Sequence, residues 1–238
     1  MKVLELENIY FSYNGDDKNN PLIKNISFSL EKNEFLSIVG SSGCGKSTII
    51  KLIAGIENVA SGTIKGETTG YMPQKDLLLP WRTVLENIIL PYEINKRDKK
   101  EAVEKAVTYL KKVHLEEYKD KFPSELSGGM RQRVSFLRTL LTDGDILLLD
   151  EPFSALDAIT KENLQQWLLE TLKEFNKSVV FITHDINEAI FLSDRILVCK
   201  DKPLEHFEEF ILPKDKDKHY DDLIVMKEKI LHIIRGDN

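Results

Sequence analysis

Several features are scarce in this sequence of 238 residues. It has only two cysteines, Cys44 and Cys199, which excludes a disulfide framework and suits a reducing cytosol. It has no run of about 18 apolar residues, so we expect no segment that spans a membrane. Its 33 Lys and Arg residues against 39 Asp and Glu give a net charge of −6, which argues against broad nucleic-acid binding. Glu5 and Glu7 stand where a secretory signal would be apolar, so no signal is expected.

The apolar runs predict an α/β fold. Almost entirely apolar runs predict buried strands of a parallel sheet at 35–39, 146–149, 179–183 and 196–199. Apolar and polar residues alternate near 3–7 and 26–30, which predicts antiparallel strands with one solvent-exposed face. The polar residues 14–20 predict a loop. Helical spacing marks 101–113, 161–175 and 223–234, and an edge strand is expected at 207–212.

A glycine-rich loop follows the first buried run. It fits the pattern G-x-x-x-x-G-K-[ST] and leads into a predicted helix from Thr48; its residues are Gly40, Ser41, Ser42, Gly43, Cys44, Gly45, Lys46 and Ser47. Glycines let backbone N–H groups converge on phosphate oxygens, and a helix N-terminus adds positive potential. We expect Lys46 to reach the terminal phosphates and Ser47 to offer its hydroxyl to Mg²⁺. The alternative is a glycine-rich turn that holds no ligand.

The second buried run ends in two carboxylates, Asp150 and Glu151. Ligands of open α/β sheets bind at the carboxyl ends of strands, so Asp150 is placed to hold Mg²⁺ and Glu151 to act as general base on a water. The alternative is a solvated strand end. Together with the phosphate loop, this strand end predicts a P-loop nucleotide hydrolase.

A second glycine-rich helix start decides the class. Its residues are Leu126, Ser127, Gly128, Gly129 and Met130, and it predicts a second anion site in a chain with a single lysine-bearing loop. Its simplest use is to close on a nucleotide that another copy holds. Here the sequence closely resembles the ATP-binding subunits of ABC transporters, whose signature is LSGGQ-like, with Met130 where glutamine is commonest.

The resemblance covers residues 3 to about 198 and implies further site residues. Tyr13 stands where the family stacks an aromatic ring on adenine, with simple packing on the sheet as the alternative. Gln74 stands in the family's glutamine loop, which implies a role in metal binding and catalysis. This assignment rests wholly on the resemblance. His184 resembles the switch histidine that contacts the γ-phosphate. The alternative is a structural histidine at a strand end. The loop that crosses between two subunits is matched by Ser154, Ala155, Leu156 and Asp157.

The resemblance implies an α/β P-loop NTPase (RecA-like) core with an antiparallel β subdomain and an inserted helical signature subdomain. We expect one ABC ATPase domain over 1–238, with the core in 1–83 and 136–222, the helical subdomain in 84–135 and a C-terminal helix in 223–238. Two copies are implied to form a homodimer that sandwiches two ATP molecules with Mg²⁺. Cys44 is favoured as a small filler residue in the loop, with a thiol made reactive by Lys46 and the helix N-terminus.

The implied function is an ATP hydrolase that powers a membrane importer for a small molecule, resembling the nitrate, sulfonate and taurine type. Pro80 and Trp81, after three leucines, match the glutamine loop of those importers. The implied partners are transmembrane permease subunits and, indirectly, a substrate-binding protein, with no nucleic acid. The implied location is the cytoplasmic face of the membrane, as a peripheral subunit. The alternatives are a soluble ABC-type ATPase acting on ribosomes or DNA, an exporter subunit, or a regulatory module without turnover.

Overall fold

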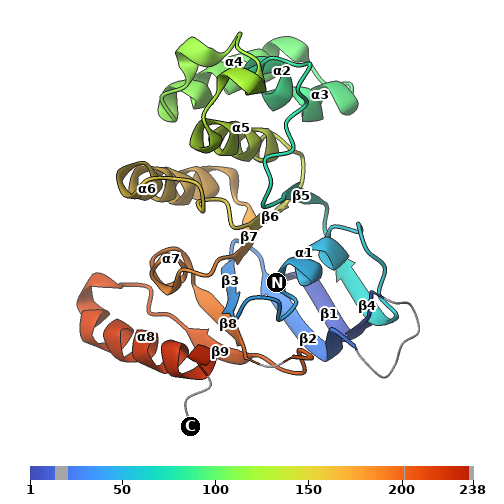
Figure 1. The fold of residues 1–238 in the computed structure, drawn as a ribbon, viewed down its shortest axis with the longest axis vertical. Helices are drawn as coiled ribbons and strands as arrows, with labels where there is room; N and C mark the ends of the chain where they lie inside the picture. Colours follow the sequence, from blue (N-terminus) through green and yellow to red (C-terminus); the bar gives the residue numbers. More distant parts are fainter. Residues whose placement is uncertain (14–20, 201, 236–238) are drawn as a thin grey trace. The chain divides into compact units, whose positions relative to one another are not determined.

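The computed structural model describes residues 1–13, 21–200 and 202–235, and the chain divides into two units (Figure 1). The first unit takes its described residues from Met1–Glu67 and Asn176–Asn238, and the second is Thr68–Phe175. The polar loop predicted at 14–20 lies outside the described residues.

An antiparallel sheet opens the first unit. Its strand order is β2-β1-β4, with β1 at Lys2–Phe11, β2 at Ile23–Glu31 and β4 at Ser61–Gly66. Leu4, Leu6 and Ile9 are buried while Glu7 and Asn8 are exposed, which is the one-sided burial that the alternating sequence predicts. The two predicted antiparallel strands are therefore confirmed, and β4 joins them as a third.

The phosphate loop belongs to the other sheet of the first unit. Within this unit its strand order is β7-β3-β8-β9, with β7 at Ser178–Ile182, β3 at Phe35–Gly40, β8 at Arg195–Cys199 and β9 at Glu208–Ile211. The strand β3 runs parallel to both neighbours, and β9 is antiparallel to β8. Every residue of β3 and β7 is buried, which explains their apolar runs.

Helices pack against this sheet. They are α1 at Lys46–Ile53, α7 at Ile186–Leu192 and α8 at Tyr220–Arg235, preceded by a 3₁₀ turn at Asp217–His219 (Figure 1). Val39, Ile196 and Val198 share one apolar cluster with Ala189 of α7 and Ile230 of α8. The predicted edge strand and terminal helix are thus confirmed as β9 and α8.

The second unit combines a parallel strand pair with helices. The strands are β5 at Thr69–Met72 and β6 at Ile146–Asp150. The helices are α2 at Val84–Ile88, α3 at Leu90–Ile94, α4 at Lys99–Lys112, α5 at Gly128–Leu140 and α6 at Ala158–Phe175, with 3₁₀ turns at Glu116–Tyr118 and Pro123–Glu125. The Trp167 ring of α6 lies edge-on to Phe136 of α5 and Tyr109 of α4, with centroids 5.8 and 5.9 Å away. These aromatic contacts hold the three helices together.

Local sequence fixes where these helices begin. Thr83 and Glu86 form a reciprocal capping box at α2. The Asp98 carboxylate accepts hydrogen bonds from the backbone N–H groups of Lys100 and Glu101 at the start of α4. The charged run 96–101 is therefore the capped start of α4. In the described part of the chain, no helix is both long enough and apolar enough to cross a bilayer.

Candidate functional site

The predicted phosphate loop joins β3 to α1. Three of its glycines have positive φ: Gly40 at 156°, Gly43 at 78° and Gly45 at 106°. Gly45 is the N-cap of α1 and offers no side-chain hydrogen bond, so the first N–H groups of the helix remain available to a ligand. The Lys46 Nζ donates to the carbonyl oxygens of Gly40 at 2.9 Å and Ser41 at 2.8 Å. The ammonium group is therefore held over the loop.

Gly40 has no room for a side chain. A Cβ atom there would lie 2.3 Å from the carbonyl oxygen of Cys199, whereas a Cβ at Gly43 would meet nothing within 4 Å. We expect Gly40→Ala to lower the free energy of unfolding by about 2–5 kcal/mol, from backbone strain plus overpacking. Gly43→Ala, the matched control, should cost about 1–2 kcal/mol because it adds strain alone. Urea denaturation measures both, and equal losses would contradict the predicted clash.

Tyr13 and His184 lie in the same unit as the loop. Tyr13 is 57% exposed, and its hydroxyl lies 2.9 Å from the Thr48 Oγ1 of α1. His184 is exposed just beyond β7, where Ile182 pairs with Ile38 of β3. The same register puts His184 level with Gly40, so the histidine and the loop share one edge of the sheet. The structure thus places His184 at the loop's edge of the sheet and Tyr13 beside α1.

The segment around His184 is tightly fixed. The Thr183 hydroxyl donates to the Glu188 Oε2 at 2.5 Å and accepts from the Asp185 backbone N–H at 3.0 Å. Asp185 in turn caps α7 by accepting from the Asn187 backbone N–H at 2.9 Å. His184 is therefore presented from a backbone that is anchored on both sides.

In the second unit, β6 ends at the two predicted carboxylates. Asp150 is buried. Burial of Tyr71, and secondarily the negative charge of Asp150, raise the pKa of Tyr71 to about 12. Glu151 follows with a left-handed backbone, φ 49°, and its Oε2 accepts a hydrogen bond of 3.0 Å from the Gln74 Nε2. The residue assigned to the glutamine loop by resemblance thus contacts the candidate base.

The predicted signature segment starts α5. Ser127 is the N-cap, and its hydroxyl accepts from the Met130 backbone N–H at 3.3 Å. Leu126 is buried, while Ser127 and Gly128 are exposed at the helix start. A Cβ at Gly129 would lie 3.1 Å from the carbonyl oxygen of Ala155, so the predicted crossing loop approaches the signature closely. Within that loop the Ser154 hydroxyl donates to the Glu151 carbonyl, and the Asp157 carboxylate caps the start of α6 at Thr160.

Sequence reasoning missed Gln132. This buried side chain donates from Nε2 to the Glu151 carbonyl at 3.0 Å and accepts at Oε1 from the Ala155 backbone N–H at 3.0 Å. It therefore ties the signature helix to the loop that begins at Glu151. The available signal was a long polar side chain two residues after Met130, on a helix otherwise rich in buried residues.

The loop after Gln74 is exposed at its tip and anchored at its base. Trp81 is 71% exposed and Leu77 is 60% exposed. Asn87 of α2, fully buried, accepts from the Leu79 backbone N–H and donates to the carbonyl oxygens of Leu79, Arg82 and Thr83 at 2.9–3.1 Å. The loop is therefore anchored even though Leu77 and Trp81 face solvent.

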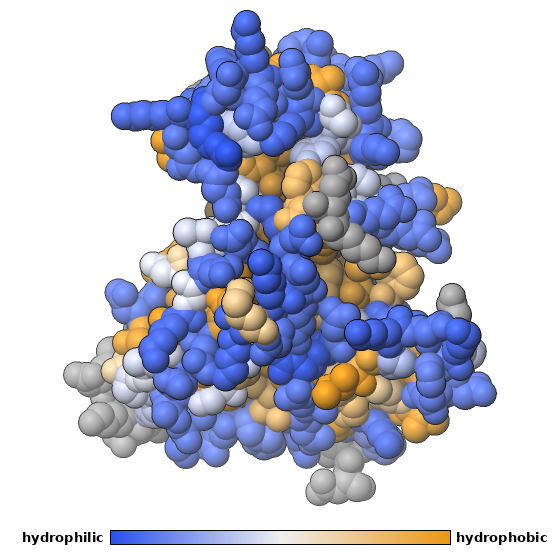
Figure 2. Space-filling view, turned by 180° about the vertical axis from the view of Figure 1, so that it is seen from behind, coloured by the Kyte–Doolittle hydropathy of each residue, from blue (hydrophilic) through white to orange (hydrophobic). Residues whose placement is uncertain are grey.

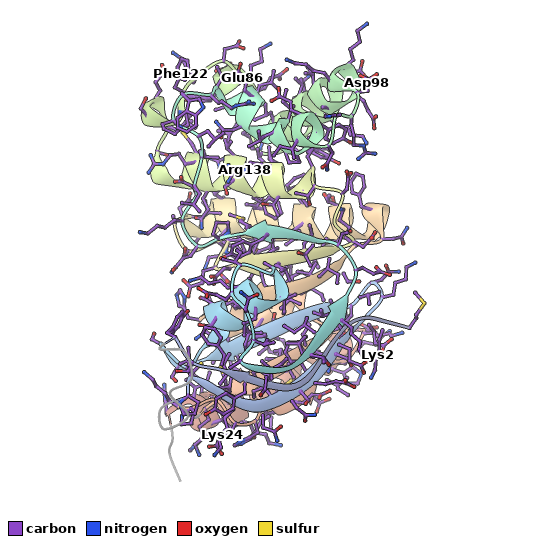
Figure 3. The ribbon with its side chains drawn as sticks, turned by 90° about the vertical axis from the view of Figure 1, so that its right-hand side faces the viewer. Lys2, Lys24, Glu86, Asp98, Phe122 and Arg138 are labelled. Atoms are coloured by element: carbon purple, nitrogen blue, oxygen red, sulfur yellow. The ribbon has the colours of Figure 1, made fainter. Side chains whose placement is uncertain are left out.

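Two arginines of α5 hold the same loop. The Arg131 Nε lies 2.9 Å from the Asp76 Oδ2, and the Arg138 guanidinium donates to the carbonyl oxygens of Asp76 and Leu77. The Val84 backbone N–H donates to the Lys121 carbonyl, so the segment of Phe122 runs beside the start of α2. Figure 3 shows Phe122 and Glu86 on these adjoining segments, and Arg138 on α5. The loop is therefore tied directly to the helix that carries the signature.

Trp81 and Leu77 are among several large apolar side chains that the described residues expose, with Ile94, Ile159 and Tyr220. The face shown in Figure 2 is mostly hydrophilic, and its hydrophobic residues gather in small separate patches. What distinguishes the loop of Leu77 and Trp81 is its anchoring by Asn87 and Arg138, which makes it a candidate surface for another protein to cover.

The glycine loop with its lysine at a helix start, and a buried strand that ends in Asp-Glu, define a P-loop nucleotide-binding protein. The model of the family "ABC transporter" matches residues 23–154, and the chain belongs to that family. It has the family's α/β P-loop fold, with an antiparallel sheet and a helical part, and it is an ATPase, the ATP-binding subunit of an ABC transporter.

Similar proteins carry more specific names. The chain is 42% identical over 217 residues to the formylaminopyrimidine import ATP-binding protein ThiZ of Halalkalibacterium halodurans, covering 90% of this chain and 86% of that protein. It is 39% identical over 221 residues to the aliphatic sulfonates import ATP-binding protein SsuB of Bacillus cereus, covering 88% and 87%. A solved dimeric ATP-binding cassette with ADP and Pi has a TM-score of 0.80 and 31% identity, covering 88% of this chain and 99% of that one.

Proposed function

We propose that the chain powers the import of a small organic molecule of the sulfonate, taurine or nitrate kind, or a related one such as a formylaminopyrimidine. The observation that carries the proposal is the anchored, exposed loop around Trp81, which gives a membrane subunit a place to dock. The names of ThiZ and SsuB support import as the direction.

Each step of ATP binding and hydrolysis has a candidate residue in the chain. The P-loop backbone and Lys46 bind the ATP phosphates, Tyr13 meets the adenine, and His184 contacts the γ-phosphate. When bound, Mg²⁺ neutralises phosphate charge, and the oxygen donors Ser47, Asp150 and Gln74 suit this hard cation. Glu151 accepts the proton of the attacking water, while Gln74 and Gln132 orient the carboxylate and its loop.

A homodimer completes the proposed ATP site. Ser127 and Gly129 of one copy meet the γ-phosphate held by the other copy, and residues 154–157 cross between the two. Because each copy gives one signature and receives one, the interface is isologous with twofold symmetry. The dimeric cassettes to which this chain is similar support this arrangement.

We infer that the chain is a peripheral protein on the cytoplasmic face of the membrane. Its helical subdomain, 84–135, then lies next to transmembrane permease subunits. The core, 1–83 and 136–222, then carries ATP, and the terminal helix α8, Tyr220–Arg235, begins at its end. A substrate-binding protein on the far side acts through the permease. ATP-driven closure of the two copies moves the loop of Trp81 and so changes the conformation of the permease.

Trp81→Ala is expected to uncouple transport from ATP use. Truncation removes the largest exposed apolar side chain of the loop, so uptake by the assembled transporter should fall at least about tenfold. Affinity for ATP should stay unchanged because no phosphate contact is altered. Tyr220→Ala on α8, which is similarly exposed, is the matched control and should keep full uptake. An equal loss of ATP affinity and uptake in Trp81→Ala would contradict the docking role.

Transport itself tests the proposed function. Deleting the gene in its native host should abolish uptake of labelled alkanesulfonates or of a formylaminopyrimidine, and the wild-type gene, but not Glu151→Gln, should restore it. The protein should also sediment with membranes that contain its permease. Unchanged uptake of all these compounds, with the protein found on ribosomes, would favour the soluble ATPase instead.

A further inference from the structure

The two cysteines of the chain meet beneath the phosphate loop. Cys44 lies between two loop glycines, and Cys199 is the last residue of β8, paired in register with Gly40. Their Sγ atoms are 2.7 Å apart, and both side chains are buried at 1% and 0% exposure. Both thiols are free. Nucleotide binding uses the loop that carries Cys44, but it assigns no task to Cys199.

The surroundings make the two thiols unequal. The Cys44 Sγ lies 3.8 Å from the Lys46 Nζ, and the Cys199 Sγ lies 3.2 Å from the Val39 carbonyl oxygen. The hydrogen bond from Cys199, followed by the positive charge of Lys46, lowers the pKa of Cys44 to about 6 against the opposing effect of burial. The same contact and burial raise the pKa of Cys199. Cys44 is thus the nucleophile, and Cys199 is the partner that keeps its proton.

We propose that Cys44 and Cys199 form a reversible oxidation site, in which a small peroxide joins them in a disulfide that removes the phosphate loop from nucleotide binding. A disulfide needs about 2.05 Å between its sulfurs, so the two atoms must approach by roughly 0.7 Å. Disulfides of reducing compartments are typically transient and redox-sensing. The proposal holds for any transported substrate because it concerns only the ATP site.

The reaction balances with one peroxide per chain. The Cys44 thiolate attacks one oxygen of H₂O₂, the O–O bond breaks, and the departing hydroxide takes up a proton to become water, leaving a sulfenic acid. The Cys199 sulfur then loses its proton and attacks the Cys44 sulfur. The S–O bond breaks, and the leaving hydroxide takes that proton as a second water. The two sulfurs together lose two electrons, which reduce the peroxide.

The bond would tie the middle of the loop to β8. Cys44 lies within the run of backbone N–H groups that must converge on phosphate, two residues before Lys46. To bind phosphate, the Lys46 ammonium must also leave the carbonyl oxygens of Gly40 and Ser41. A loop fixed to Cys199 at its centre cannot adjust in this way, so ATP affinity should fall.

Peroxide titration of the purified full-length chain tests the site. The wild type should lose the mass of two hydrogens and give a non-reduced peptide that links Cys44 to Cys199. Its affinity for ATP, measured by calorimetry, should fall at least about tenfold and recover after dithiothreitol. Cys199→Ser should bind ATP normally before treatment, because the serine hydroxyl can still donate to the Val39 carbonyl. Treated with peroxide, Cys199→Ser should gain oxygen at Cys44 without a cross-link. After a high dose of peroxide, dithiothreitol should not restore its affinity for ATP.

Cys199→Ala gives the same comparison if the serine variant does not fold. A wild type that gains oxygen without the linked peptide would overturn the proposal. A linked wild type with unchanged ATP affinity would overturn it too, because the disulfide would then not control the loop. Both outcomes are independent of transport, so they leave the importer proposal standing.

Discussion

ATP turnover is expected to fall by about 10²–10⁴-fold when Glu151 is replaced by glutamine. The amide keeps the size of the side chain and can still accept the hydrogen bond from Gln74, which joins the two residues at 3.0 Å. It cannot take a proton from the attacking water. ATP should remain bound because Lys46, Ser47 and Asp150 are unchanged.

Phosphate release under saturating MgATP measures this effect. Glu162→Gln on α6, an exposed carboxylate with no assigned part in ATP binding, is the matched control and should hydrolyse ATP at the normal rate. A Glu151→Gln protein with normal turnover would remove Glu151 from the mechanism.

Ser127→Arg is expected to lower turnover at least about 10²-fold by a different route. Ser127 is exposed at the start of α5, beside two glycines, so an arginine there projects bulk into the surface offered to the partner copy. The chain's own phosphate loop is untouched, so a single copy should still bind ATP. The loss would come from the closed dimer that no longer forms.

The loss of the helix cap must be distinguished from this steric effect on the dimer. The Ser127 hydroxyl accepts from the Met130 backbone N–H, and losing such a cap costs about 1 kcal/mol. Ser127→Ala loses the cap without adding bulk, so it should hydrolyse ATP much faster than Ser127→Arg. Equal activity of the two variants, measured as phosphate release, would contradict steric exclusion of the partner.

The sequence was sufficient wherever a local pattern sets the structure. The apolar run of β3, the glycines of the loop and the lysine at the start of α1 are all contiguous, and the structure has them in that order. The serine before two glycines is likewise the N-cap of a helix, because capping is decided within four residues.

Contacts between distant residues could not be predicted in this way. The strand β4 has mostly exposed, polar side chains, and its pairing with β1 is what makes it a strand. Cys199 is 155 residues from Cys44, and the register of β8 on β3 brings them together. Gln132 is an ordinary polar residue until its contacts with Glu151 and Ala155 are known. Such roles depend on tertiary packing, which leaves no periodic signal in the chain.

The closed ATP-bound dimer is tested most directly by size-exclusion chromatography with light scattering on Glu151→Gln, with and without MgATP. The variant binds ATP without consuming it, so the closed state should accumulate. The expected result is the mass of one chain without nucleotide and twice that mass at saturating MgATP, with the Glu151→Gln, Ser127→Arg double variant remaining at one chain in both. A Glu151→Gln protein that binds MgATP and still elutes with the mass of a single chain would contradict the two-copy ATP site.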